Sequence, residues 1–94
     1  MITIHKYPLT KVGDVALKEC DEEFRILGLI EVLSAERDPE GRMCIWVKVN
    51  TDAQNEETVA VYIRGTGHDI SSMRATFLST VVCPPYVWHI FIGY

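Results

Sequence analysis

Val59-Ala60-Val61-Tyr62-Ile63-Arg64-Gly65-Thr66-Gly67-His68 is the stretch of sequence that decides the fold. Its first five residues are mostly β-branched or aromatic and alternate with a period of two, which is typical of a strand. Two glycines follow, and glycine permits the sharp backbone turn that ends a strand. The stretch therefore predicts a strand from Glu57 to Arg64 and a tight turn directly after it.

The remainder of the chain repeats this pattern of short strands and turns. A period of two, rather than the 3.6 of a helix, predicts further strands over residues 2–7, 15–19, 24–33, 43–50, 73–82 and 86–92. Residues 14–20 are open to the alternative of a helical turn, and a second helical turn could begin at Asp69, acting as its cap. We expect an all-β fold: a small antiparallel sandwich or partly open barrel of about six to seven strands, with at most a short helical turn.

Composition limits the classes of partner. Ninety-four residues predict a single domain over residues 1–94. The net charge of -4 argues against a nucleic-acid polymer as partner, since such proteins usually carry a basic excess. Three cysteines without a C-x-x-C pair indicate reduced thiols, and no apolar run approaches the ~18–20 residues of a membrane helix. The start of the chain does not resemble a signal peptide, so we expect a cytoplasmic protein without a membrane partner.

Two predicted strands, at Ile26–Leu33 and Val87–Ile92, are apolar on both faces. Such a strand needs cover on both sides, and a chain this short has little of its own to supply a second cover. We therefore expect a homo-oligomer with one of these strands at the interface. The alternative is a closed barrel or two-sheet sandwich in which a loop and aromatic rings provide the cover.

Sequence motifs give little support to catalysis. The Gly65–Ile70 segment lacks the lysine of a Walker loop and the third glycine of a dinucleotide-binding fingerprint. His5, His68 and His89 lie on three separate segments, and no carboxylate pair sits in an apolar setting. We expect no catalytic residue, no metal and no cofactor.

The Gly65–Gly67 turn is nevertheless suited to an anion. Arg64 and His68 flank it, and the Thr66 hydroxyl and the Gly67 amide add two hydrogen-bond donors. An ordinary turn at the end of a strand is the equally good structural alternative.

Two further residues extend this candidate site. Tyr62 shares a face of its strand with Arg64, so a flat ring could stack on it while the guanidinium meets a phosphate. Tyr7 is expected to face outward in the same way. Arg74 begins the next predicted strand and would approach Arg64 if the two strands paired as a hairpin, an arrangement suited to a bis-phosphate or cyclic ligand. The candidate ligand-binding residues are Tyr62, Arg64, Thr66, Gly67, His68 and Arg74.

Three parts of the chain carry a family resemblance: Ile2 with His5 to Leu9, Ile63 to Ile70, and Val87 to Phe91. With their Lys-Tyr-Pro-Leu, Gly-Thr-Gly-His and Trp-His-Ile-Phe motifs, they resemble a family of small, mostly phage-encoded proteins of unknown function. The chain departs from that family at Asp21–Glu23 and in the 36–42 loop. The resemblance supplies no catalytic residue.

A phage origin would imply one class of function in particular. Small β-rich phage proteins that form oligomers include sponges, which trap nucleotide signals made by bacterial defence systems. The leading hypothesis is a non-enzymatic accessory protein that sequesters a small phosphorylated ligand, such as a nucleotide, in the host cytoplasm. The alternatives are an interaction protein that inhibits a host enzyme, and a structural or virion accessory protein.

Overall fold

The computed structural model of the protein describes residues 1–10 and 21–93. Seven strands are formed there: β1 (Ile2–Pro8), β2 (Glu22–Leu27), β3 (Leu29–Arg37), β4 (Met43–Asn50), β5 (Glu56–Gly65), β6 (Thr76–Cys83) and β7 (Tyr86–Gly93). The strand predicted over residues 15–19 and the alternative helical turn over residues 14–20 lie outside the described residues.

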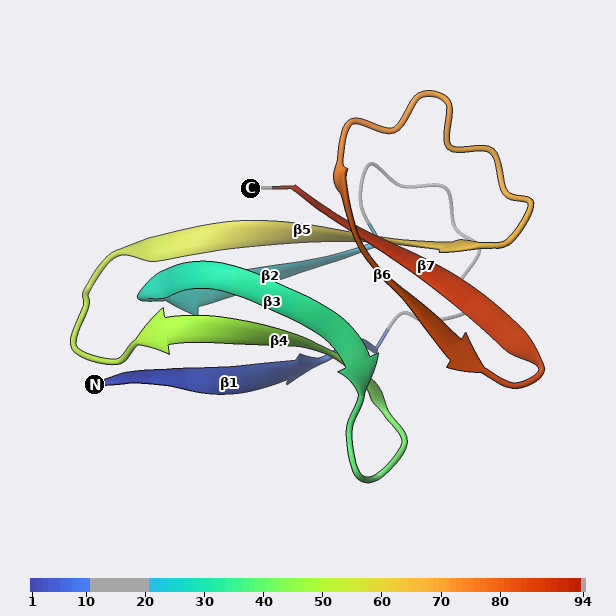
Figure 1. Ribbon diagram of the computed structural model, residues 1–94. Helices are drawn as coiled ribbons and strands as arrows, with labels where there is room; N and C mark the ends of the chain where they lie inside the picture. Colours follow the sequence, from blue (N-terminus) through green and yellow to red (C-terminus); the bar gives the residue numbers. More distant parts are fainter. Residues whose placement is uncertain (11–20, 94) are drawn as a thin grey trace.

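All strand pairs are antiparallel, and they form two sheets with the orders β1-β4-β3 and β2-β5-β7-β6 (Figure 1). The sheets do not close into a barrel in the described part of the chain. At one corner the β3 edge meets the β6 edge through a hydrogen bond from the Ala35 amide to Ser79 Oγ, 2.9 Å long. The prediction of an all-β antiparallel sandwich or partly open barrel is therefore confirmed. No described segment forms a helix, so none of them contains a helix long and apolar enough to span a membrane.

Gly28 corrects the prediction of one strand over residues 24–33. Its φ of +72° breaks that segment into β2, in one sheet, and β3, in the other. The Gly28 amide donates to the Asn55 carbonyl, and the Asn50 amide donates to the Gly28 carbonyl. Apolar residues stand on both sides of the glycine, Ile26 and Leu27 before it and Leu29 and Ile30 after it, so the apolar run alone does not mark the crossing between the sheets.

The core lies between the two sheets and is built from the inward residues of the strands. In β4, Ile45, Val47 and Val49 are buried, whereas Trp46 and Lys48 point to the outer face, as alternation predicts. The other buried hydrophobic residues are Leu9, Ile26, Leu29, Val32, Ala35, Met43, Cys44, Val59, Val61, Ile63, Val81, Ile90 and Ile92. Both sheets contribute to this single core, as expected of a sandwich.

The orientation of β1 was predicted wrongly. Tyr7 pairs with Ile45, and residues directly opposite each other share a face of the sheet, so the ring points inward. Its centroid lies 5.5 Å from that of Phe24, whereas Ile2 and Ile4 are exposed on the outer face. Pairing with β4 sets this orientation, and the sequence of β1 alone carries no information about that pairing.

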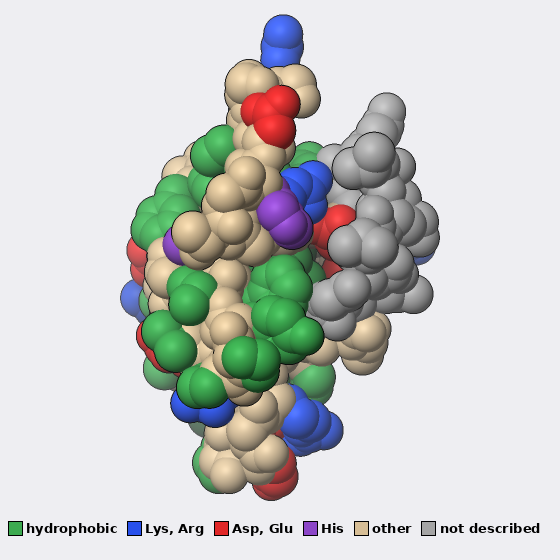
Figure 2. Space-filling model, turned by 90° about the vertical axis from the view of Figure 1, so that its right-hand side faces the viewer, with side chains coloured by type: hydrophobic (Ala, Val, Ile, Leu, Met, Phe, Trp, Pro, Cys, Tyr) green, Lys and Arg blue, Asp and Glu red, His purple; other side chains and the backbone are tan. Residues whose placement is uncertain are grey.

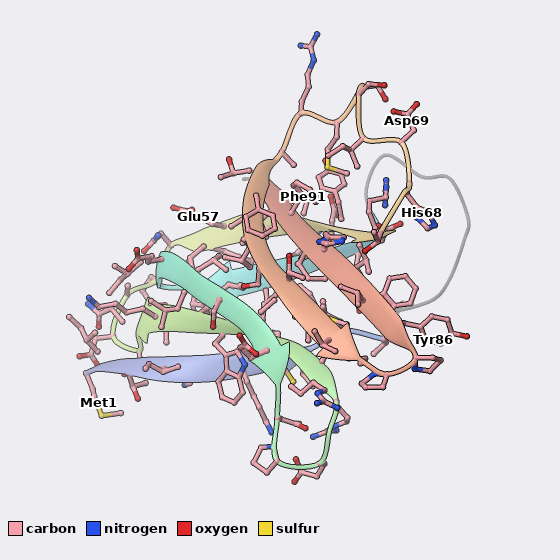
Figure 3. The ribbon with its side chains drawn as sticks, turned by 45° about the vertical axis from the view of Figure 1, so that its right-hand side comes forward. Met1, Glu57, His68, Asp69, Tyr86 and Phe91 are labelled. Carbon is pink, nitrogen blue, oxygen red and sulfur yellow. The ribbon has the colours of Figure 1, made fainter. Side chains whose placement is uncertain are left out.

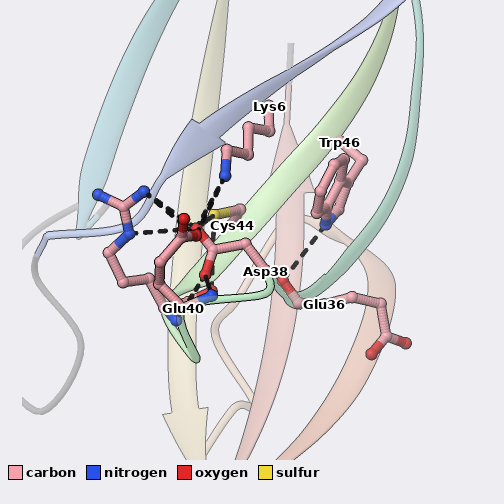
Figure 4. A network of polar contacts seen from close by, with 7 residues as sticks. Lys6, Glu36, Asp38, Glu40, Cys44 and Trp46 are labelled. Atoms are coloured by element: carbon pink, nitrogen blue, oxygen red, sulfur yellow. Dashed lines mark hydrogen bonds and ion pairs between the residues drawn. The ribbon is translucent and has the colours of Figure 1, made fainter.

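Asp38 is a buried carboxylate in the turn between β3 and β4. Its Oδ1 accepts the amides of Glu40 and Arg42, at 3.0 and 2.9 Å, and its Oδ2 accepts Lys6 Nζ at 2.9 Å and Arg42 Nε at 3.1 Å (Figure 4). Burial alone would raise the pKa of Asp38, but the hydrogen bonds from Lys6 and Arg42 hold it far below its ordinary value. The network joins β1 to the turn between β3 and β4.

Asp38→Asn is expected to lower the melting temperature at neutral pH, with a loss that shrinks in acid. The folded-state pKa lies below the unfolded one, so the stabilisation by Asp38 is present above about pH 4 and is lost as the pH falls through the folded pKa. Thermal melts of both proteins between about pH 7 and pH 2 should therefore converge at low pH. The control is Asp52→Asn, an exposed carboxylate paired with the amino terminus. A pH-independent difference between wild type and Asp38→Asn would contradict this account.

Candidate functional site

The backbone conformation and the packing of the turn at residues 65–68 account for both of its glycines. The His68 amide donates to the Gly65 carbonyl at 3.1 Å, and Gly67 has a φ of +90°, as the third residue of a type II turn requires. The Gly65 amide donates to His68 Nδ1 at 3.0 Å, and a Cβ on Gly65 would lie 3.2 Å from His68 Cε1. The turn therefore fixes the His68 ring directly above Gly65.

Arg64 is already engaged by a carboxylate. Its Nη1 lies 2.6 Å from Asp21 Oδ2, which also accepts the Ile63 amide, and Nη1 donates in addition to the Ile63 carbonyl. The Asp21 side chain is only 8% exposed, so Asp21 is a buried partner of Arg64. Arg64 Nε and Nη2 make no hydrogen bond with another described residue, so Arg64 keeps donors for a ligand although its charge is balanced.

A hollow of about 410 Å³, which we call the arginine hollow, lies between the end of β5 and the loop over residues 66–75. It is lined by Tyr62, Arg64, Asp69, Ile70, Ser72, Met73 and Arg74. Three of the six candidate residues thus meet at one place. Strands β5 and β6 do not pair as a hairpin, because β7 lies between them. The path of the loop, rather than strand pairing, brings Arg74 to the hollow.

Asp69 gives the arginine hollow an acidic side. Its Oδ1 accepts the Ser71 hydroxyl at 2.6 Å and the Ser71 amide at 2.9 Å, so it stabilises a short turn rather than the predicted helical one. These two hydrogen bonds lower the pKa of Asp69. With Asp21 counted, two arginines face two carboxylates. The hollow is therefore suited to a ligand of low negative charge that also carries hydroxyl or amino donors.

Tyr62 also belongs to a row of rings on the outer face of its sheet. It lies opposite Phe91 of β7, which lies opposite Phe77 of β6. The ring centroids of Phe77 and Phe91 are 5.6 Å apart, and Phe77 is exposed. Sequence reasoning did not single out Phe77 and Phe91 as surface rings, because only the pairing register places them on the outer face beside Tyr62.

The Thr66 hydroxyl has a hydrogen-bond partner within the protein. Its Oγ1 lies 2.8 Å from His89 Nε2, and His89 Nδ1 lies 2.9 Å from Thr80 Oγ1. His89 therefore ties the turn after β5 to β6 across β7, which is a structural role. Among the described residues, no group of three metal-ligating side chains is assembled.

A second hollow of about 550 Å³, which we call the aromatic hollow, lies beside the same turn. It is lined by Gly65, Thr66, His68, Pro85, Tyr86, Val87 and Trp88. Thr66 and His68 therefore face this hollow rather than the arginine hollow, and Gly67 lines neither of the two. Sequence reasoning did not select Tyr86 and Trp88, because core packing accounts equally well for aromatic residues on a strand.

Hydrophobic side chains gather at this end of the molecule, next to a histidine (Figure 2). Figure 3 shows that His68, from the turn, and Tyr86, at the start of β7, lie at the same end of the sandwich. Met1 and Glu57 lie at the opposite end. The six residues predicted as one site are therefore divided between two neighbouring hollows and the tip of the turn.

Comparison with known proteins gives a family but no activity. Residues 1–94 match a family described as a domain of unknown function, DUF7352. No curated protein and no solved structure matches the chain. A function must therefore be argued from the geometry of the two hollows.

Proposed function

Because the chain belongs to the DUF7352 family, whose function is unknown, we propose from its geometry that it binds and sequesters a small phosphorylated ring compound, such as a nucleotide. The observation that carries this proposal is the convergence of Tyr62, Arg64 and Arg74 on one hollow. A ring on which a base can stack and guanidinium donors for a phosphate are the two elements of nucleotide binding. The volume of about 410 Å³ lies within the range of small-molecule sites.

The charges around the hollow favour a ligand with a single negative charge. A second phosphate charge would approach Asp69 and Asp21, which already balance the two arginines. A 3′,5′-cyclic nucleotide carries one negative charge, and its ribose hydroxyl or base amino group could donate to Asp69. We therefore favour the cyclic ligand over the bis-phosphate.

The side chains that line the arginine hollow are poorly suited to proton transfer, which favours sequestration of the ligand over its turnover. General acid–base catalysis is most effective when a group has a pKa near the working pH. The lowered pKa of Asp69 makes it a weak proton acceptor at neutral pH, and arginine stays protonated in proteins. In this proposal the protein is a phage accessory protein that holds a nucleotide immune signal in the cytoplasm of a bacterial host.

A depletion assay tests this function. The purified protein, in excess, is incubated with 5′-monophosphates, 3′,5′-cyclic monophosphates and cyclic dinucleotides, and is then removed by filtration. The filtrate should lack one class of compound, and heating the retained protein should release that compound unaltered. Release of an altered compound would indicate an enzyme, and a filtrate with every compound undiminished would contradict binding.

The exposed edges of the sandwich favour a second role, as a self-associating interaction protein. Ile2 and Ile4 on β1, and Phe77 and Val82 on β6, are exposed, and both strands lie at the edge of a sheet. Edge strands with apolar side chains can pair with another chain, and a second copy is the partner that we propose. Light scattering that gives a monomer mass at micromolar concentration would remove this candidate.

A further inference from the structure

The geometry points to a second binding site, independent of the arginine hollow: the aromatic hollow, which takes an uncharged flat ring that bears a hydrogen-bond acceptor. Its described lining contains no lysine, arginine, aspartate or glutamate. The described lining therefore offers a phosphate no counter-charge, whereas a neutral ring would keep its interactions there without a desolvated charge. The volume of about 550 Å³ is sufficient for a nucleobase or nucleoside.

Tyr86 and Trp88 provide the stacking surface. They lie two residues apart on β7, and their ring centroids are 5.5 Å apart with an angle of 32° between the planes. Trp88 is half-buried and packs against the core, while Tyr86 is 61% exposed. A rigid ring beside an exposed one leaves apolar area that a third flat ring can cover, and near-parallel aromatic stacking is favourable.

His68 provides a hydrogen-bond donor with a fixed direction. A backbone N–H can only donate, so His68 Nδ1 accepts the Gly65 amide through its lone pair. The neutral imidazole must then carry its proton on Nε2, which has no hydrogen-bond partner among the described residues. The hydrogen bond from the Gly65 amide orients the ring. A ring nitrogen or carbonyl on the ligand is the complementary group.

Tryptophan fluorescence tests this site with adenosine as the probe and ribose as the control without a ring. Trp46→Phe removes the other tryptophan, which lies on the opposite sheet, so that Trp88 alone reports. Adenosine is expected to quench the emission in a saturable way, whereas ribose is not. Tyr86→Ala should weaken binding about tenfold, since stacking on one aromatic residue contributes on the order of 1–3 kcal/mol. His68→Phe, which keeps a ring but removes the donor, should weaken binding to a smaller extent.

The same variants separate this site from the arginine hollow. Because Tyr86 is largely exposed, Tyr86→Ala should keep the wild-type melting temperature and the depletion activity proposed above. Arg74→Glu should leave the quenching by adenosine unchanged. The inference is overturned if adenosine gives no saturable quenching at millimolar concentration, if ribose quenches equally, or if Arg74→Glu abolishes the effect.

Discussion

Gly28→Ala is expected to destabilise the protein by about 2–5 kcal/mol, a large part of the roughly 5–15 kcal/mol by which domains are stable. A Cβ at this position would lie 2.1 Å from the Asn50 carbonyl oxygen, which is backbone and cannot rotate away. The φ of +72° adds about 1–2 kcal/mol for any residue with a side chain. Displacing packed backbone costs about 1–3 kcal/mol more.

Gly41→Ala is the matched control for Gly28→Ala. Gly41 has a φ of +83°, but a Cβ there would meet no atom within 4 Å. It therefore shares the backbone strain without the clash, and we expect a loss of about 1 kcal/mol. Urea unfolding followed by circular dichroism measures both. Equal losses for the two variants would show that the close crossing at Gly28 does not determine how the chain passes between the sheets.

Arg74→Glu is expected to weaken ligand binding in the depletion assay by at least about tenfold, since a charge-assisted hydrogen bond contributes about 1.5–3 kcal/mol. The change removes the one arginine of the hollow that forms no ion pair with another described residue, and it places a second carboxylate near Asp69. Arg74 is exposed, so the fold should not change. Arg64→Ala would be a poorer test, because it leaves the buried Asp21 without its partner.

Arg37→Glu is the control for charge. Arg37 is exposed at the end of β3, in the other sheet, and the substitution changes the net charge of the protein by the same amount. We expect wild-type depletion by this variant. A loss of binding equal to that of Arg74→Glu would indicate a general charge effect, and unchanged binding by Arg74→Glu would remove the arginine hollow as the site.

Local sequence predicted the fold class well because strand periodicity is a local property. Apolar and polar-facing residues alternate from Ile45 to Asn50, and β4 occupies the predicted residues Met43–Asn50. The same signal failed at Gly28, because apolar residues continue directly after it although the chain has passed into a different sheet. It also failed for Tyr7, since the orientation of an edge strand depends on its pairing with β4.

The candidate site was predicted less completely because its contacts are distant in sequence. Asp21 meets Arg64 from 43 residues away, and nothing near either residue marks the pair. The turn was predicted correctly, and the structure adds that its two glycines accommodate the backbone turn and the His68 ring. The path of the 66–75 loop places Arg74 beside Tyr62 in the arginine hollow and His68 beside Trp88 in the aromatic hollow. The local sequence does not predict that path.

The central claim is that a nucleotide binds between β5 and the 66–75 loop. The most direct measurement is a map of amide chemical shifts in ¹⁵N-labelled protein, titrated with the compound that the depletion assay removes. We predict that the largest shifts fall within residues 62–64 and 69–74 and saturate together. Shifts that are largest elsewhere, or none at saturating compound, would contradict the proposal.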